Sequence, residues 1–482
     1  MTTLARLVFP ALRWRRGSFA HERARIDAAL EAGVGGFILF GGTTAAVAAL
    51  TRALRDVAGR PLLIGADLER GAAQQVRGLT DLPPPAALGA LDDLEATATA
   101  GVLTAGEAAA VGINWVFAPV CDLDVEPANP IVQTRAFGAD PARVAAHAEA
   151  WIRACQEHGV LACAKHYPGH GRTTLDSHEG LPDVAAPRER LEGSDLAPFA
   201  AAVAAGVGSV MAAFVSYSAW DPSGRAAGFS PEILGWLRRR GFAGVTVTDA
   251  LIMGGALAVD TEAAAAVRAV QAGCDALLYP RDFAAVIRAL DRAAGREIPA
   301  ARADDALARV AAAAARWAPP APADLPDLAA HGAFADGLAD RALAVWRGAA
   351  PRIAGPLRIA IVDDDVGGPY AVGPRNLFEG ALRDAGVSIE GWRMGDEGGG
   401  KGKGGRVVLV YAEPRSWKGR ALLGERSLGR LRALVPGADL VVLFGHPRLV
   451  AQIPAGPPVL GAWHGQPLMQ RAAARWVAAA RA

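Results

Sequence analysis

The feature that most constrains this fold is a series of short apolar runs separated by alanine-rich stretches with helical spacing. Most of the runs have the length of a strand and lack strict alternation of apolar and polar residues. This pattern is typical of parallel strands that helices cover on both faces. Eight such runs, alternating with helices, predict a (β/α)8 TIM-like barrel. The runs lie at residues 4–9, 35–40, 62–67, 113–119, 160–166, 209–217, 244–250 and 275–280.

The chain changes character after the eighth run. Residues 317–328, WAPPAPADLPDL, are rich in proline, which breaks helices and predicts a linker. A second series of apolar runs follows and predicts a smaller open α/β sandwich domain with helices on both faces of a parallel sheet. These runs lie at 357–365, 387–394, 406–413, 438–447 and 457–463. We therefore expect a catalytic barrel at 1–316, a linker and connecting helix at 317–350, and a C-terminal α/β domain at 351–482.

The charge balance argues against two classes of partner. With 50 basic and 49 acidic residues, the formal net charge is +1, so we expect neither nucleic acid nor a membrane surface as a partner. No apolar stretch has the length of a membrane span, and the N-terminal segment lacks a regular signal-peptide pattern. The four cysteines form no C-x-x-C pair and are expected to be buried free thiols. We expect a cytoplasmic protein that is a monomer or homodimer.

A barrel places its reactive groups at the carboxyl ends of the strands, and several predicted strands end in a charge. Asp67 ends the third run, Lys165 and His166 end the fifth, and Asp249 lies near the end of the seventh. Arg135 lies in the loop after the fourth run. Each charge alone is also compatible with solvent exposure or a structural ion pair. Together they predict a polar pocket on one rim.

Asp249, in VTVTDALIMGGA, is the candidate nucleophile. A carboxylate can attack an anomeric carbon and hold the sugar as a covalent intermediate. The alternative is that Asp249 serves as the N-cap of the following helix. The stretch alone does not decide between these roles.

Residues 165–178, KHYPGHGRTTLDSH, contain three of the nine histidines of the chain. Asp176 lies two residues before His178, and a neighbouring carboxylate can fix the tautomer of a histidine and raise its basicity. His178 could then donate a proton to a leaving oxygen and later deprotonate water. Glycines 169 and 171 would allow this loop to extend over the pocket and move.

Two other interpretations of this segment remain open. His166 and His178, together with His170 and Asp176, could bind a metal, although the spacing matches no standard metal motif. Alternatively, His170 and Asp176 only brace the loop through hydrogen bonds. For His170 we favour the bracing role.

These motifs resemble those of glycoside hydrolase family 3, and within it the bacterial β-N-acetylhexosaminidases. The family's K-H-F-P-G-H-G-x-T-x-x-D-S-H pattern corresponds to residues 165–178. NPIVQTRAFG at 129–138 is similar to the stretch around a substrate-binding arginine, and VTDALIMGGA is similar to the nucleophile segment. INWVFAPV at 113–120 matches a further family segment. The resemblance extends over about residues 1–315.

The resemblance implies a role for each candidate residue. Asp249 would be the nucleophile of a retaining glycoside hydrolase, and His178, paired with Asp176, would be the acid/base. No metal and no organic cofactor is implied. The residues implied to hold the sugar are Asp67, Arg135, Lys165 and His166, with Met253 lining the pocket.

The sequence departs from the family pattern at several positions. Gln75 stands where a substrate-facing arginine is expected, and Arg70 or Arg77 could substitute for it. Arg172 replaces a residue that is often acidic, and Phe214 stands where a histidine is common. Residues 395–402, GDEGGGKG, resemble a phosphate-binding loop but lack its Ser or Thr, so we interpret them as an exposed loop.

The leading hypothesis is hydrolysis of terminal β-linked N-acetylglucosamine from small glycosides or muropeptides during peptidoglycan recycling. A family 3 β-glucosidase or β-xylosidase is an alternative, although such enzymes lack the Asp-Ser-His element. A β-GlcNAc phosphorylase is another, because a histidine acid/base lets phosphate approach where a carboxylate would repel it. The nonenzymatic alternative is a sugar-binding protein on a degenerate barrel, which the retained nucleophile and Asp–His pair disfavour.

Overall fold

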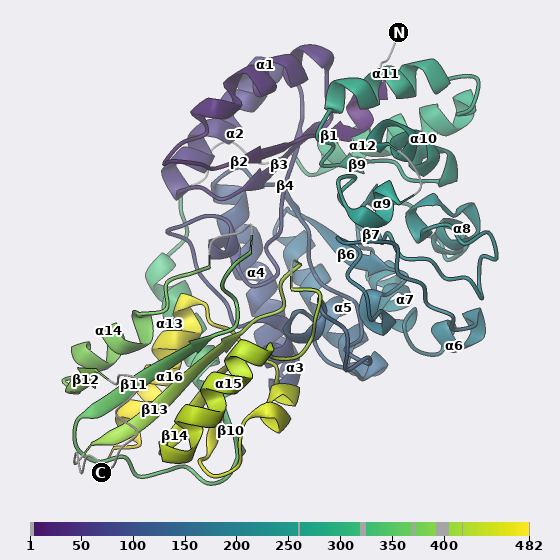
Figure 1. Ribbon diagram of the computed structural model, residues 1–482. Coiled ribbons are helices and arrows are strands. Elements are labelled where there is room, and N and C mark those ends of the chain that lie inside the picture. Colours follow the sequence, from purple (N-terminus) through teal and green to yellow (C-terminus); the bar gives the residue numbers. More distant parts are fainter. Residues whose placement is uncertain are drawn as a thin grey trace. The chain divides into compact units, whose positions relative to one another are not determined.

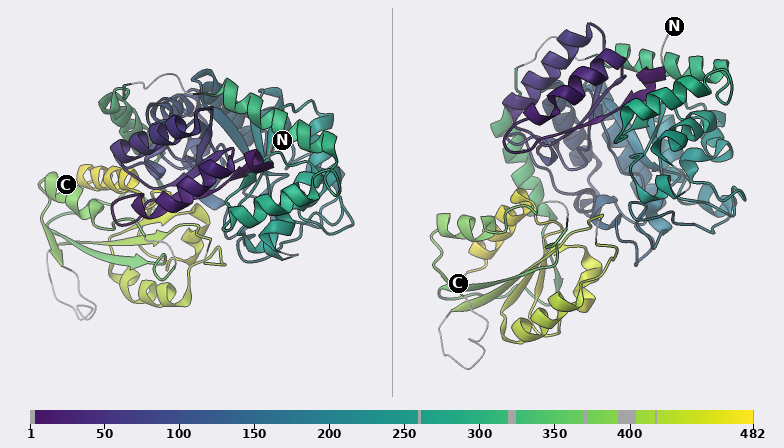
Figure 2. Two further views of the ribbon diagram at one scale, coloured as in Figure 1. Left: turned by 90° about the horizontal axis from the view of Figure 1, so that it is seen from above. Right: turned by 45° about the horizontal axis from the view of Figure 1, so that its top comes forward.

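The structure is a computed structural model that describes residues 4–258, 261–318, 324–368, 372–391, 404–416 and 418–481. The chain divides into two compact units, which are drawn in Figures 1 and 2. The first unit comprises Met1–Thr80, Asp92–Glu126 and Ala136–Leu328. The second comprises Asp81–Leu91, Pro127–Arg135 and Ala329–Ala482. Two segments that the sequence assigned to the barrel domain therefore belong to the second unit.

The first unit is built around a curled parallel β-sheet with helices between successive strands (Figure 1). Seven strands follow one another in the order β2-β3-β4-β5-β6-β7-β8, and every neighbouring pair is parallel. The strand bounds are β2 Ala11–Arg13, β3 Gly36–Phe40, β4 Leu63–Ala66, β5 Trp115–Val116, β6 Leu161–Tyr167, β7 Ser209–Ala212 and β8 Val245–Thr248.

Further pairing continues beyond both edges of this sheet. β1 (Val8–Phe9) pairs in parallel with β9 (Leu277–Leu278). On the other side of β9, the backbone N–H of Thr248, at the end of β8, donates to Ala276 O at 3.0 Å. Only Pro10 separates β1 from β2.

The predicted strand at residues 4–9 is wrong in its first half, because Leu4–Leu7 form a 3₁₀ helix. Leu4 and Leu7 are both buried, and a short apolar run suits a buried helical turn as well as a buried strand. Pro10, which has no N–H to donate to a sheet, marks the break between β1 and β2.

Large apolar side chains fill the inside of the curled sheet. Trp115 makes edge-to-face contacts with Phe9 and Phe117, with ring centroids 5.4 and 5.0 Å apart. Its indole N–H donates to Ser209 Oγ at 2.8 Å, so the buried polar atom is satisfied. A Cβ at Gly65 would lie 2.5 Å from the Phe117 ring, which explains the glycine in the middle of β4. The prediction of buried free thiols is confirmed for all four cysteines.

Several helices of the first unit begin at polar caps. Thr43, Asp93, Asp140 and Ser230 each accept a hydrogen bond from a backbone N–H in the first turn, as N-cap side chains do. No helix in the described residues is long and apolar enough to cross a membrane. The helix bounds are α1 Arg23–Ala32, α2 Thr44–Ala58, α4 Leu94–Ala110, α5 Pro141–Glu157, α6 Arg188–Glu192, α7 Ala197–Ala204, α8 Pro231–Arg239, α9 Gly254–Leu257, α10 Glu262–Ala272, α11 Phe283–Ala293 and α12 Ala300–Arg316.

The second unit has its own sheet, in the order β10-β15-β14-β13-β11-β12. All pairs are parallel except β10 with β15, so residues predicted as part of a connecting region supply an antiparallel edge strand. Part of the predicted linker, 319–323, and the predicted loop at 395–402 lie outside the described residues. The strand bounds are β10 Ala344–Arg347, β11 Leu357–Asp363, β12 Ile389–Gly391, β13 Gly405–Ala412, β14 Leu440–Gly445 and β15 Val459–Gly461.

Two apolar clusters cover the two faces of this second sheet. Consecutive residues such as Leu409 and Val410, in β13, point to opposite faces and belong to different clusters. One cluster includes α14 and α16, and the other includes α15, which lie on opposite sides of the sheet in Figure 1. The arrangement is that of a doubly wound α/β sheet. The helix bounds are α3 Pro85–Leu91, α13 Leu328–Ala342, α14 Leu377–Asp384, α15 Glu425–Leu434 and α16 Pro467–Ala479.

A buried ion cluster joins the last strands of the first unit to two of its helices. Asp275, which is fully buried before β9, accepts from Arg238 of α8 at 2.7 Å and from Arg302 of α12 at 2.5 Å. It also accepts from the backbone N–H of Thr246 in β8 at 2.9 Å. Burial raises the pKa of Asp275 in spite of the two guanidinium groups. One carboxylate thus fixes α8 and α12 against the end of the sheet.

We expect Asp275→Ala to destabilise the first unit by about 3–5 kcal/mol, because it removes the buried carboxylate that pairs with both Arg238 and Arg302. Asp305→Ala is the matched control, since Asp305 also pairs with Arg302 but is largely exposed. That change should cost less than about 1 kcal/mol. Denaturant unfolding measures both. Equal losses of unfolding free energy in the two variants would show that the buried Asp275 carboxylate contributes no more to stability than the exposed Asp305 does.

Candidate active site

Charged side chains gather where β4 and β6 end. Lys165, in β6, is almost completely buried, and its ammonium group lies 2.6 Å from Asp67 Oδ1 and 2.8 Å from Glu69 Oε1. Asp67 directly follows β4. A buried ammonium is tolerated only with such paired carboxylates. The predicted proximity of Asp67 and Lys165 is therefore observed, and Glu69 is a partner that the sequence analysis missed.

A second charged group lies beside the first, at the end of β6. His166 Nδ1 lies 2.7 Å from Asp122 Oδ2, and Asp122 Oδ1 accepts from the backbone N–H of His170 at 2.6 Å. Burial alone would raise the pKa of Asp122, but the two histidines hold it below its usual value. Asp122 therefore orients His166 and anchors the start of the histidine loop. It too was missed by the sequence analysis. The peptide bond between Lys165 and His166 is cis.

The predicted Asp176–His178 pair is present. His178 Nδ1 lies 2.7 Å from Asp176 Oδ1, which also accepts from the backbone N–H of His178 at 3.0 Å. Asp176 is fully buried, whereas 42% of the His178 side chain is exposed. Burial tends to raise the pKa of Asp176, but the bonds and charge of His178 lower it overall. The carboxylate at Nδ1 fixes the tautomer and the orientation of the His178 ring.

His170 makes the bracing contacts that the sequence analysis favoured. Its Nε2 lies 2.7 Å from Ser177 Oγ, and its Nδ1 lies 2.8 Å from Thr173 Oγ1. Burial lowers the pKa of His170 in spite of the nearby Asp122 carboxylate. In the parts of the chain that the structure describes, no group of three His, Cys, Asp or Glu side chains is arranged to hold a metal ion. The histidines of this loop instead face separate protein partners.

Backbone hydrogen bonds join the histidine loop to the turn that carries Asp249. The N–H of Gly254 donates to His178 O at 3.0 Å, and the N–H of Gly255 donates to Ser177 O at 2.9 Å. A Cβ at Gly254 would lie 2.5 Å from the carbonyl carbon of Glu179. The two glycines after Asp249 therefore allow two backbones to meet. His178 and Asp249 are carried by segments in direct contact.

Asp249 directly follows β8, and its backbone N–H donates to Ala212 O at the end of β7. Its Oδ1 accepts from the N–H of Ala250 at 2.7 Å. The next helix, α9, has Met253 at its N-cap position and no capping side chain. The alternative role of Asp249 as a helix cap is therefore wrong.

The charges of three predicted site residues, Asp67, Lys165 and Asp249, all affect the pKa of the buried Cys163 thiol. Burial raises its pKa to about 12, a hydrogen bond with Ser209 and the charge of Lys165 oppose this rise, and the charges of Asp67 and Asp249 add to it. Cys163 lies in β6, between the strands that carry the two aspartates. The electrostatics thus indicate that Asp67, Lys165 and Asp249 lie around one part of the sheet.

Two further predicted residues, Met253 and Arg135, make the following contacts with the protein. Met253 is buried in the main apolar cluster of the first unit. That it lines a sugar pocket stays a prediction. Arg135 belongs to the second unit, where its Nη1 donates to Ile131 O at 3.3 Å. Its predicted substrate contact also stays a prediction. Gln75, at the position expected to hold an arginine, accepts from the backbone N–H of Gly41 at 3.0 Å.

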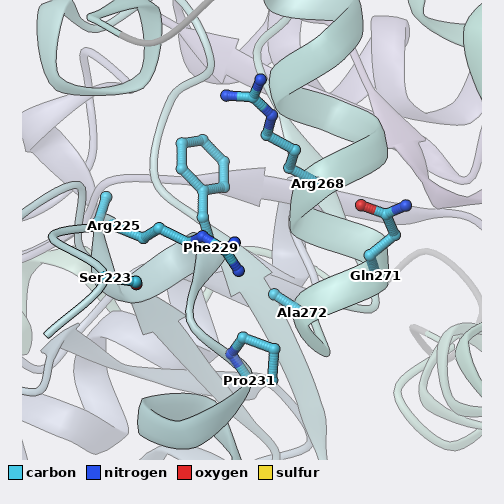
Figure 3. Close-up of a pocket in the computed structure, with 8 residues that line it drawn as sticks. Ser223, Arg225, Phe229, Pro231, Arg268, Gln271 and Ala272 are labelled. Atoms are coloured by element: carbon cyan, nitrogen blue, oxygen red, sulfur yellow. The ribbon is translucent and has the colours of Figure 1, made fainter. Parts of the chain in front are cut away.

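Cavity size does not identify the site. A cavity of about 440 Å³ lies between α10 and the chain before α8, and none of the predicted residues lines it. Figure 3 shows Arg268 and Gln271 on the helix and Arg225 and Phe229 on the facing segment. A second cavity, of about 320 Å³, borders the histidine loop and is lined by residues that include Arg172 and Asp183. The paired charges, not either of these two cavities, define the candidate site.

The site thus supplies a carboxylate and a proton-transfer group on adjoining segments, which is what a glycoside hydrolase requires. A model of the glycosyl hydrolase family 3 N-terminal domain matches residues 11–313. The chain therefore belongs to glycosyl hydrolase family 3 and is a glycoside hydrolase.

Individual relatives are similar to this chain over different lengths. A beta-hexosaminidase from Chromobacterium violaceum is 39% identical over 287 residues, which cover 56% of this chain and 78% of that protein. A beta-N-acetylglucosaminidase/beta-glucosidase from Cellulomonas fimi is 36% identical over 261 residues, which cover 52% of this chain but only 46% of that protein. The structure of a family 3 beta-N-acetylglucosaminidase from Paenibacillus sp. FPU-7 is 26% identical, with a TM-score of 0.86, and covers 99% of this chain and 96% of that one.

Gly254→Ala should separate the histidine loop from the Asp249 turn, because the added Cβ meets the backbone of Glu179. We expect glycosidase kcat/KM to fall by about a hundredfold, since small displacements of reacting groups have effects of this size. Gly106→Ala is the matched control: Gly106 lies in α4, and a Cβ there meets nothing within 4 Å. Activity and thermal unfolding should be measured together. A fully active Gly254→Ala enzyme would show that the contact does not position the reacting groups.

Proposed function

We propose that this protein is a retaining β-N-acetylhexosaminidase that removes terminal β-linked N-acetylglucosamine from small glycosides. The observation that carries the proposal is the backbone contact that brings the Asp176–His178 pair to the turn of Asp249. Relatives named beta-hexosaminidase and a structure named beta-N-acetylglucosaminidase support this choice of sugar.

In the first step of the proposed mechanism, Asp249 attacks the anomeric carbon. The bond to the leaving oxygen breaks, and that oxygen takes a proton from Nε2 of His178. In the second step, His178 accepts a proton from water as the water oxygen attacks the anomeric carbon. Asp249 then leaves as a free carboxylate. Buried Asp176 stabilises the charged imidazolium and holds its ring in place.

The remaining charged groups would hold the sugar. Asp67 is partly exposed while it accepts from Lys165, so its carboxylate can bind hydroxyl groups in a fixed orientation. His166, oriented by Asp122, would contact the substrate, and Arg135 would contribute from the segment that carries it. These contacts require no metal or organic cofactor.

The strand pairing supports a further structural proposal. The bonds from β8 to β9, the β9–β1 pair and the β2–β3 pair would close the curled sheet into a (β/α)8 barrel. The candidate residues would then lie at its carboxyl rim. We also propose that the substrates are cell-wall fragments processed in the cytoplasm, by a monomer or homodimer.

The decisive assay compares chromogenic β-GlcNAc, β-glucoside and β-xyloside substrates. We expect clear preference for the GlcNAc substrate, and Asp249→Ala should lower its turnover by at least about a thousandfold. Added azide should restore cleavage of an activated aryl glycoside by this variant, because a small anion can take the place of the lost carboxylate. Asp305→Ala is the control for loss of a carboxylate.

Three outcomes would contradict this proposal. Preference for glucoside or xyloside would favour the alternative family 3 activities. No turnover of any substrate would favour a sugar-binding protein. Near wild-type turnover by Asp249→Ala would reject Asp249 as the nucleophile.

The role of His178 can be tested through the leaving group. We expect His178→Ala to lower kcat/KM by about a hundredfold or more for substrates with poor leaving groups, which need a proton. Activated aryl substrates, which need little protonation, should lose less than about tenfold in kcat/KM. His158→Ala is the matched histidine control, since the His158 ring hydrogen-bonds to Ala154 O of its own helix. Equal losses for both kinds of substrate would argue against acid catalysis by His178.

A phosphorylase remains a second candidate, and the observation that favours it is the use of a histidine instead of a carboxylate as acid/base. An uncharged imidazole does not repel phosphate from the anomeric carbon. Phosphate would then attack the glycosyl-enzyme and release the sugar 1-phosphate. Assays with and without phosphate separate the two activities by their products.

A further inference from the structure

Two segments of the second unit come from loops that leave strands of the curled sheet at their carboxyl ends. Asp81–Leu91 lies between β4 and α4, and Pro127–Arg135 lies between β5 and α5. The second segment ends with Arg135, the predicted sugar-binding arginine. Within the second unit, α3 of the first segment contacts the 3₁₀ turn Gln133–Arg135.

The sheet of the second unit has a topological switch point. The chain passes from β11 outward to β12 and then returns to the other side of β11 to form β13, β14 and β15. In doubly wound sheets, ligands bind outside the carboxyl ends of the strands at such a reversal. The loops after β11 and β13 flank this reversal, and the loops after β14 and β15 continue the same carboxyl edge of the sheet.

In this protein, that edge of the sheet binds the chain's own segments 81–91 and 127–135. Gln466, after β15, donates from Nε2 to Leu82 O at 2.6 Å. Arg448, after β14, donates from Nη1 to Pro127 O at 3.4 Å. In the loop after β13, Ala421 O accepts from Gln133 Nε2 at 3.4 Å. Each of the three loops thus contacts one of the segments.

Gln133 is the central residue of these contacts. Its side chain is buried and donates to both Asn129 O, at 3.1 Å, and Ala421 O. Its φ angle is +38°, which L side chains rarely adopt and which persists where the surroundings fix it. Asn129 Oδ1 accepts from the N–H groups of Ile131 and Val132, which completes a tight turn. Arg135 follows Gln133 by two residues.

Ion pairs fix the loop that offers the Ala421 carbonyl. Arg375 lies 3.1 Å from Glu413, at the end of β13, and 2.8 Å from Asp365, after β11. Lys418 pairs with Asp365 at 2.8 Å, and the N–H of Gly424 donates to Asp364 at 3.0 Å. The loop after β13 is therefore attached to the end of β11 on both sides of Ala421. It offers a rigid acceptor to Gln133.

We propose that the second unit uses its switch-point edge to hold the segment 127–135, and that Gln133 is a positioning residue for Arg135. This inference rests on the proposed function, in which Arg135 contacts the sugar.

The test is a double-mutant cycle between Gln133→Gly and Arg135→Ala. Glycine removes both side-chain hydrogen bonds but tolerates the positive φ. With the chromogenic β-GlcNAc substrate, we expect Gln133→Gly to raise KM about tenfold and to change kcat less than about threefold. In the Arg135→Ala background, the same change should alter KM less than about twofold, because the residue that it positions is gone.

Control variants separate positioning from general loss of structure. Arg475→Ala, which removes an exposed ion pair with Asp340 in the same unit, should leave KM unchanged. Gln133→Glu keeps the shape but cannot donate, so it should behave as Gln133→Gly does. If Gln133→Gly fails to fold by circular dichroism, Gln466→Ala, which releases Leu82, should still raise KM severalfold.

Unchanged KM in folded Gln133→Gly enzyme would overturn the positioning role, as would an equal rise in both backgrounds. If only Gln466→Ala folds, unchanged KM in that variant would overturn it. Lack of turnover by the wild-type enzyme would instead overturn the proposed function. The two failures are thereby distinguished.

Discussion

The contact between the histidine loop and the turn after β8 is the constraint on which the candidate site depends. His178 and Asp249 are far apart in the sequence, and two backbone hydrogen bonds from Gly254 and Gly255 join the segments that carry them. Because the Cβ of any other residue at Gly254 would meet the backbone of Glu179, the contact requires glycine. Main-chain contacts vary less than side-chain contacts. They therefore suit the task of holding the proposed nucleophile and the proposed acid/base together.

Paired charges at strand ends appear in both units and solve the same physical problem. In the first unit, buried Lys165 pairs with Asp67 and Glu69. In the second, Arg375 and Lys418 pair with carboxylates that follow β11 and β13. A charge withdrawn from water is tolerated only beside its counter-charge, so each pairing also fixes the loops that carry the partners. The partly exposed Asp67 keeps one group accessible for a ligand, whereas the second network is directed to protein atoms.

The features that could be predicted from the sequence are those that depend on residues close together in the chain. The strand positions were close to those observed, and the Asp176–His178 pair could be read from a spacing of two. Glu69 and Asp122 were missed because their partners lie on other strands, and only the sheet register brings them together. Residues 4–7 were assigned to a strand because periodicity does not distinguish a short buried strand from a helical turn. The inclusion of 127–135 in the second unit depends on contacts about 300 residues away, which no local pattern encodes.

At the positions where this chain departs from the family pattern, the side chains contact other residues of the protein. Gln75 accepts from the backbone of Gly41, and Arg172 pairs with Asp195 at 2.8 Å. Phe214 packs against Phe229 with ring centroids 5.1 Å apart. These three side chains therefore help to hold the segments that carry them. Selectivity would then depend on groups directed to the ligand, Asp67, His166 and Arg135, and for Arg135 it would depend on how firmly Gln133 fixes the segment that carries it.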